Sequence, residues 1–346
     1  MSYPSGAMEG RPRLIVTGVE GALGGNLALA LSQQFAVLGL YHRRAISLEG
    51  CQTAPWRPDD EADWKATICR ESPRWIIHCG PLARSSWDVV PEIPDGAREG
   101  RLWLALAGLA EKRETRLTVL TTDAVFAGPR MFHAEDSPAG SCQPLGRAAI
   151  EAEQYLKHSP RVLLARTHAF GWSPPGEELG VVGRVWASLV SGGREPLEVD
   201  RHATPILATD LADLLGDAYR RQLTGLYHLA GAERVTPHQF ARQLARAFGL
   251  PGEFPASHAG ENGDRHFLCE APGGRAATEG RSRQKVPVLF FPLDETSLAT
   301  GRAREALGRP MPMLREGLDR LVQQTHQGYR SRFRAGRPRD PLGRAA

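Results

Sequence analysis

A β-α-β opening constrains the fold of this chain more than any other feature of its sequence. The run Arg13 to Thr17 is apolar and of β type, apolar residues then recur at helical spacing from Leu23 to Phe35, and a second β-type run covers Ala36 to Tyr41. Three glycines at G-x-x-G-x-x-G spacing separate the first strand from the helix: Gly18, Gly21 and Gly24. This order of elements predicts a parallel sheet with crossover helices.

The glycine turn predicts a dinucleotide site. Glycines at a strand-to-helix turn let the backbone approach a pyrophosphate, whose charge the free N–H groups of the helix N-terminus then stabilise. The predicted cofactor contacts in this turn are Gly18, Gly21, Leu23 and Gly24. A tight turn that needs glycine only for its positive φ is the alternative interpretation.

The residues after the second strand bear on which dinucleotide would bind. Proteins that bind NAD place an acidic residue there, whereas this chain has Arg43 and Arg44. Basic residues suit a 2′-phosphate, so the pair predicts NADP(H), with NAD(H) as the second choice; an accidental solvated pair is the alternative. His78 and Cys79 end a third strand candidate at the edge where cofactors lie, and Cys79 and the following Gly80 are also predicted contacts, although a buried turn of small residues fits the same pattern.

The alternation of strands and helices continues along the chain. Further strands are expected at 75–79, 117–121, 162–166 and 226–229, and further helices at 98–112 and 236–248. The pattern predicts an α/β protein with a Rossmann-type doubly wound parallel sheet and a smaller C-terminal substrate lobe. Residues 11–171 form the predicted dinucleotide-binding domain, to which 204–232 return, and residues 172–203 and 233–325 form the lobe.

Two segments fall outside this pattern. Residues 256–286 are rich in Gly, Arg and Glu without a period, which predicts a mobile loop. Residues 326–346 hold six arginines against one aspartate and account for the whole net charge of +4, so they predict a disordered basic tail. Because the basic residues elsewhere do not cluster, the charge argues against nucleic acid as a partner.

Composition bears on membrane, metal and compartment. The longest nearly unbroken apolar run, Leu102 to Ala110, has nine residues, whereas a bilayer span needs about 20. No apolar segment of the kind found in secretory signals precedes Arg13. The five cysteines are widely spaced and lack a C-x-x-C pair, which predicts reduced thiols and no metal site. We therefore expect a cytoplasmic protein without a membrane partner.

A longer motif carries a family resemblance. Leu120 to Gly128 reads LTTDAVFAG and resembles the Ser/Thr-Thr-Asp-x-Val-Phe-x-Gly signature of the dTDP-4-dehydrorhamnose reductase family, within the extended short-chain dehydrogenases/reductases. Other segments resemble the family in the same order and extend the likeness over roughly residues 13–322. They are Gly18 to Gly24, Arg166 to Gly171, Thr204 to Ala212, Gly225 to Gly231, Asp294 to Gly308 and Glu316 to Leu318.

The resemblance implies a Rossmann domain that binds NADPH or NADH, a lobe that grips a nucleotide sugar, and a catalytic Thr/Tyr/Lys set. Thr122 matches the threonine. Where the family reads Tyr-Gly-x-x-Lys-x-x-x-Glu, this chain reads LGRAAIEAE, so that Leu145 replaces the tyrosine and Ala149 the lysine, while Gly146 and Glu153 keep the register. Neither replacement can carry a proton or hydrogen-bond a ribose.

Substrate contacts are predicted at Asp123 in the signature and at Arg201 and His202 before Thr204. The last two would meet a diphosphate, although a solvated loop fits that stretch equally well.

Three hypotheses follow. The chain is a noncatalytic relative that binds a dinucleotide or nucleotide sugar and serves a protein partner or its own homo-oligomer, for which the noncatalytic regulatory subunit of methionine adenosyltransferase looks like a precedent. Alternatively, it is an active nucleotide-sugar oxidoreductase that takes its proton from water, Thr122 or Asp123. The third reading is a scaffold that binds through its arginine-rich tail. If the scaffold still positions the reactants, the double change Leu145→Tyr with Ala149→Lys is predicted to create NADPH-dependent reduction.

Overall fold

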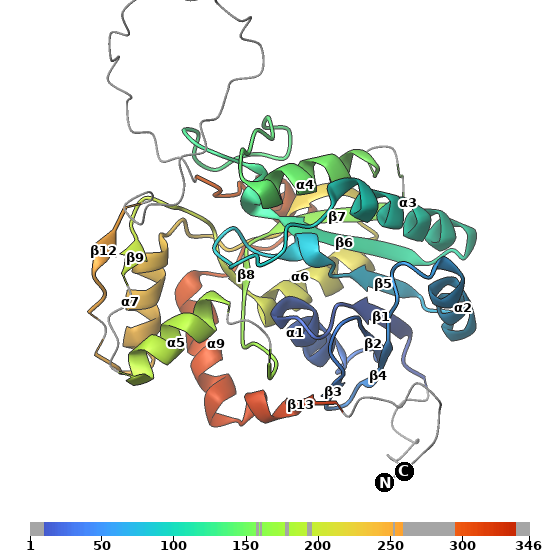
Figure 1. The fold of residues 1–346 in the computed structure, drawn as a ribbon, viewed down its shortest axis with the longest axis horizontal. Helices are drawn as coiled ribbons and strands as arrows, with labels where there is room; N and C mark the ends of the chain where they lie inside the picture. Colours follow the sequence, from blue (N-terminus) through green and yellow to red (C-terminus); the bar gives the residue numbers. More distant parts are fainter. Residues whose placement is uncertain are drawn as a thin grey trace, which may run out of the picture.

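The structure, a computed structural model, describes residues 10–156, 159, 161–176, 180–191, 196–251, 253–258 and 295–336. At its centre lies a parallel sheet of seven strands in the order β11-β7-β6-β5-β1-β2-β4 (Figure 1). These strands are β1 (Arg13–Thr17), β2 (Ala36–Tyr41), β4 (Gln52–Pro55), β5 (Trp75–His78), β6 (Arg116–Thr122), β7 (Val162–Thr167) and β11 (Gly225–His228). The predicted Rossmann-type α/β fold is confirmed.

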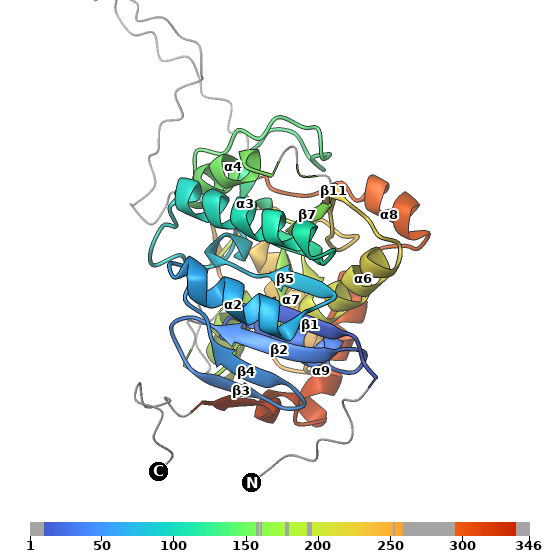
Figure 2. The ribbon, with the colours of Figure 1, turned by 90° about the vertical axis from the view of Figure 1, so that its right-hand side faces the viewer.

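Helices cover both faces of the sheet. On β1, Leu14 and Val16 pack toward α1 (Ala22–Leu31) and α6 (Ala208–Arg220), whereas Ile15 packs toward the opposite helices. Those opposite helices are α2 (Glu61–Glu71), α3 (Gly96–Lys112) and α4 (Pro144–Gln154). Figure 2 shows α2 and α3 on one side of the sheet and α6 on the other. Because neither face meets water, the central strands are continuous apolar runs rather than alternating ones.

A smaller lobe adjoins the sheet (Figure 1). It contains α5 (Val181–Ser191), α7 (Pro237–Ala247), α9 (Leu314–His326) and the paired short strands β9 (Leu197–Glu198) and β12 (Ala256–Ser257). Helix α7 begins at a capping box between Thr236 and Gln239 and packs against α5 and α9. Between the sheet and this lobe, β8 (Ala169–Phe170) pairs with β10 (Ile206–Leu207); α8 (Gly301–Leu307) precedes α9.

The prediction of a disordered tail from residue 326 is wrong for residues 326–336. After α9 the chain forms a short 3-10 turn and then β13 (Phe333–Ala335), which pairs antiparallel with β3 (Ile46–Leu48). Tyr329 and Phe333 are buried, and this apolar burial fixes a segment whose charge suggested a free tail. Residues 337–346, like residues 259–286 of the predicted mobile loop, lie outside the described residues.

The cysteines differ in part from the expectation. Cys51, Cys69 and Cys79 are free thiols, but Cys142 is disulfide-bonded, because wide spacing in the sequence does not prevent contact in space. In the described part of the chain, no helix is long and apolar enough to cross a membrane, and no cluster of His, Cys, Asp or Glu could hold a metal ion.

Candidate functional site

The glycine turn brings the ends of two strands together. Gly18 has a φ of +67°, and a Cβ built on it would lie 2.0 Å from the carbonyl oxygen of Cys79. A Cβ on Gly24 would lie 2.4 Å from the carbonyl oxygen of Gly18. Side chains are therefore excluded at both positions. Gly21 caps α1, whose first turn contains no acidic residue, so the positive end of the helix has no carboxylate of its own.

A cavity of about 580 Å³ opens along this turn. Its size is typical of a site for a small molecule or cofactor. Its walls include all eight residues predicted as cofactor contacts: Gly18, Gly21, Leu23, Gly24, Arg43, Arg44, Cys79 and Gly80. The first half of α3 and residues 169–171 also line it. The parallel sheet explains this convergence, because the carboxyl ends of β1, β2 and β5 meet at one edge.

At the end of β2, a carboxylate that sequence reasoning missed lies among the predicted arginines. One oxygen of Glu20 accepts the backbone N–H of His42 at 2.8 Å and that of Arg43 at 3.1 Å. The Arg43 side chain forms an exposed ion pair with Glu92, at 2.8 Å, which holds the pKa of Glu92 below its usual value. Arg44 donates to the carbonyl oxygen of Glu20 at 2.7 Å and to that of Gly176.

A second polar pair lines the cavity wall between β5 and α3. Nδ1 of His78 lies 2.9 Å from Oγ1 of Thr17, and its Nε2 lies 3.9 Å from Oε2 of Glu99. Within the described residues, neither this Nε2 nor this Oε2 has a hydrogen-bond partner, although both are buried. Buried polar atoms without partners are costly, so this wall is suited to a ligand or water that supplies the missing bonds.

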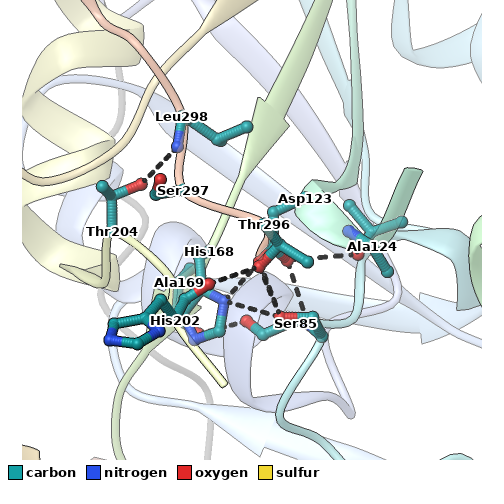
Figure 3. A network of polar contacts seen from close by, with 12 residues as sticks. Ser85, Asp123, Ala124, His168, Ala169, His202, Thr204, Thr296, Ser297 and Leu298 are labelled. Atoms are coloured by element: carbon teal, nitrogen blue, oxygen red, sulfur yellow. Dashed lines mark hydrogen bonds and ion pairs between the residues drawn. The ribbon is translucent and has the colours of Figure 1, made fainter. Parts of the chain in front are cut away.

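Asp123 lies outside the cavity wall, in a buried polar network (Figure 3). Its carboxylate accepts the N–H of Ser86 at 2.9 Å, the hydroxyl of Ser86 at 2.6 Å and the hydroxyl of Thr296, and it lies 2.8 Å from Nδ1 of His168. Burial alone would raise the pKa of Asp123, but the His168 ring and these hydrogen bonds outweigh it and lower that pKa. The ring of Trp87 packs edge-on against His168. Sequence reasoning missed His168 and Thr296.

The three positions of the catalytic set are not part of the cavity wall. Thr122 is buried, and its hydroxyl accepts the N–H of Ala124 at 3.0 Å. Leu145 is 6% exposed and Ala149 is 0% exposed, both on the face of α4 that packs into the apolar cluster with α3. None of Thr122, Leu145 and Ala149 is among the residues that line the cavity.

Two contacts fix the position of α4 against the sheet. Glu153 accepts from Nη2 of Arg166 on β7 at 2.6 Å, and both side chains are buried. A Cβ on Gly146 would lie 2.1 Å from the carbonyl oxygen of Ala124, so the start of α4 sits directly on the turn after β6.

Arg201 and His202 likewise do not line the cavity. Arg201 is buried and donates to the carbonyl oxygen of Ser86 at 2.5 Å and to Glu198 at 2.9 Å. Nδ1 of His202 lies 3.8 Å from the carboxylate of Glu295, and burial lowers the pKa of His202. The hydrogen bond from Arg201 ties its segment to the loop that carries Ser86.

Comparison with known proteins agrees with the fold and the motifs. Residues 12–261 match the family model described as the RmlD substrate binding domain. A probable low-salt glycan biosynthesis reductase of Haloferax volcanii is 26% identical over 244 residues, which is 68% of this chain and 79% of the relative. Methionine adenosyltransferase 2 subunit beta of Xenopus laevis is 26% identical over 249 residues, which is 69% of this chain and 73% of the relative. The crystal structure of dTDP-4-dehydrorhamnose reductase from Bacillus anthracis in complex with NADP aligns with a TM-score of 0.66 and 16% identity, over 91% of this chain and 99% of the other.

Proposed function

The chain belongs to the family of the RmlD substrate binding domain, and on that premise we propose that it binds NAD(P)(H) in the cavity along its glycine turn without catalysing carbonyl reduction. The residues present fit a dinucleotide. The glycine turn and the uncharged first turn of α1 would hold the pyrophosphate, and Arg43 and Arg44 lie where the adenosine would end. The likeness to a reductase crystallised with NADP supports the same choice of ligand. A bound nicotinamide would supply a hydride.

The proposal that this chain does not catalyse reduction rests on the replacement of the proton-transfer groups. In the family that the sequence resembles, a tyrosine donates the proton and a lysine holds the nicotinamide ribose. Leu145 and Ala149 stand at these positions and are packed into the apolar cluster. Two other candidate donors are buried in contacts of their own. The Thr122 hydroxyl accepts the N–H of Ala124 and donates to the carboxylate of Asp123, and Asp123 is ionised more readily than usual. A carboxylate with a lowered pKa is a poor general acid at neutral pH.

Such a chain would act as a binding or regulatory module. The likeness to a protein named as a subunit of methionine adenosyltransferase favours a protein partner, and the likeness to reductases favours a nucleotide sugar as a further ligand.

A second candidate function, an active oxidoreductase with a different acid, is favoured by Asp88. This carboxyl lines the cavity, and burial raises its pKa, as a general acid requires. It accepts the N–H of Ser85 at 3.0 Å.

Calorimetric titration and a turnover assay are expected to separate these functions. We expect NADH or NADPH to bind. The binding free energy should be about 1.5–3 kcal/mol less favourable than in a family member that keeps the lysine, because the contact of the lysine with the nicotinamide ribose is missing. We expect no turnover with 4-keto nucleotide sugars, because a general acid is typically worth about 10²–10⁴ in rate.

Two outcomes would contradict the proposed function. Turnover that Asp88→Asn abolishes would establish the second candidate. Absence of binding for both dinucleotides would reject the proposed function altogether.

A further inference from the structure

Glu20 belongs to the glycine turn, but its carboxylate reaches the end of the neighbouring strand. Its Oε1 accepts the two N–H groups that follow β2, those of His42 and Arg43. Its Oε2 is buried and lacks a hydrogen-bond partner in the described part of the chain. Glu20, His42 and Arg43 all line the cavity. A carboxylate with one unsatisfied oxygen therefore lies in the cavity wall where a Rossmann protein binds the adenosine ribose.

We propose that Glu20 is a specificity-determining residue that favours the free ribose diol of NAD(H) over the 2′-phosphate of NADP(H). The inference rests on the proposed function and extends it to the choice of dinucleotide. The unsatisfied oxygen can accept from a ribose hydroxyl, whereas a phosphate in the same place would meet a like charge. Glu20 also occupies the two N–H groups that a phosphate would otherwise use. A carboxylate from the glycine turn thus takes the role that a residue on β2 has in many NAD-binding proteins.

The two arginines oppose this selection to different degrees. The side chain of Arg44 is already hydrogen-bonded within the protein, because it donates to the carbonyl oxygens of Glu20 and Gly176 in the cavity wall. It is therefore less available to a phosphate. Within the described residues, the side chain of Arg43 is bound only to Glu92, through an ion pair in which both side chains are more than 70% exposed. Exposed pairs contribute little to stability, so Arg43 can leave Glu92 for a phosphate. Discrimination between the dinucleotides then depends on two opposing side chains: Glu20, which favours NAD(H), and Arg43, which favours NADP(H).

Glu20→Gln tests the proposal. Glutamine keeps a carbonyl oxygen for the N–H groups of His42 and Arg43 but removes the charge. Measured by calorimetry, the ratio of Kd for NADPH to Kd for NADH is expected to fall by about tenfold or more, as suits the loss of one close like-charge contact. Arg43→Ala is expected to raise the same ratio, because it removes a cation that can bind the 2′-phosphate. The side chain of Arg43 is exposed, so its removal should not disturb the fold. Glu49→Gln is the matched control, since it removes one negative charge from an exposed side chain outside the cavity and should leave the ratio unchanged.

The result that overturns the inference is an unchanged ratio in Glu20→Gln while both dinucleotides bind the folded variant. An equal change in Glu49→Gln would also overturn it, because the effect would then be one of net charge. Failure of the unaltered protein to bind either dinucleotide would reject the proposed function instead. If Glu20→Gln does not fold, an unchanged ratio in Arg43→Ala counts against the inference.

Discussion

Acidification below pH 6.5 is expected to destabilise the protein by up to about 1.4 kcal/mol per pH unit through one residue, His228. This side chain is buried at the end of β11. Its Nδ1 lies 3.2 Å from the carbonyl oxygen of Ala299 and donates to it, and its Nε2 lies 3.5 Å from Nη1 of Arg166. The ring is therefore neutral, with its lone pair toward a guanidinium. Burial and the Arg166 charge lower the pKa of His228 to about 3.

The sign follows from the two pKa values. The unfolded chain binds a proton at His228 near pH 6.5, whereas the folded chain does so only near pH 3. The contribution to stability is thus complete above pH 6.5 and is lost as the pH falls toward 3.

Urea unfolding between pH 7.5 and 5 measures this loss. His228→Gln keeps a donor for Ala299 and an acceptor for Arg166 but does not titrate, so its stability should fall less steeply with acid than that of the parent. Some slope remains, because burial lowers the pKa of His133 too. His326→Gln, at an exposed histidine at the end of α9, is the control and should keep the parental slope. Equal slopes in the parent and in His228→Gln would contradict the prediction.

Much of the sheet could be predicted because its strands carry local signals. The bounds of β1 and β2 agree with the sequence prediction, since buried parallel strands are short apolar runs ended by glycine or polar residues. The pairing of β3 with β13 could not be predicted in this way. Each strand has three residues, too few for a period, and they lie at opposite ends of the sequence.

The same distinction holds for the candidate site. The eight predicted cofactor contacts share one cavity because glycine spacing and strand ends determine that edge of the sheet. Glu20 and Glu99 escaped notice because their roles depend on contacts with β2 and β5, which no local pattern encodes. Asp123 was expected to face substrate, but Thr296, far along the chain, encloses it in a polar network.

The structure also changes the expected result of restoring the lost side chains. The double variant Leu145→Tyr with Ala149→Lys is expected to show no NADPH-dependent reduction and to lose about 3–5 kcal/mol of stability, the usual cost of an uncompensated buried charge. From sequence alone, a gain of activity is the natural prediction. However, Ala149 has no exposed surface and shares an apolar cluster with Trp103 and Leu106 of α3. A lysine there would have to displace these neighbours before it could reach the cavity.

Chemical denaturation and a reductase assay on the single and double variants test this expectation. Gln154→Lys adds the same side chain to the exposed face of α4 and should change stability by no more than about 0.5 kcal/mol. If the double variant instead reduces a 4-keto nucleotide sugar while Leu145→Tyr and Ala149→Lys alone do not, the two groups act as a unit on a bound dinucleotide. The cavity would then extend to α4 when ligand binds, and the loss of reduction in this chain would rest on two side chains rather than on a closed site.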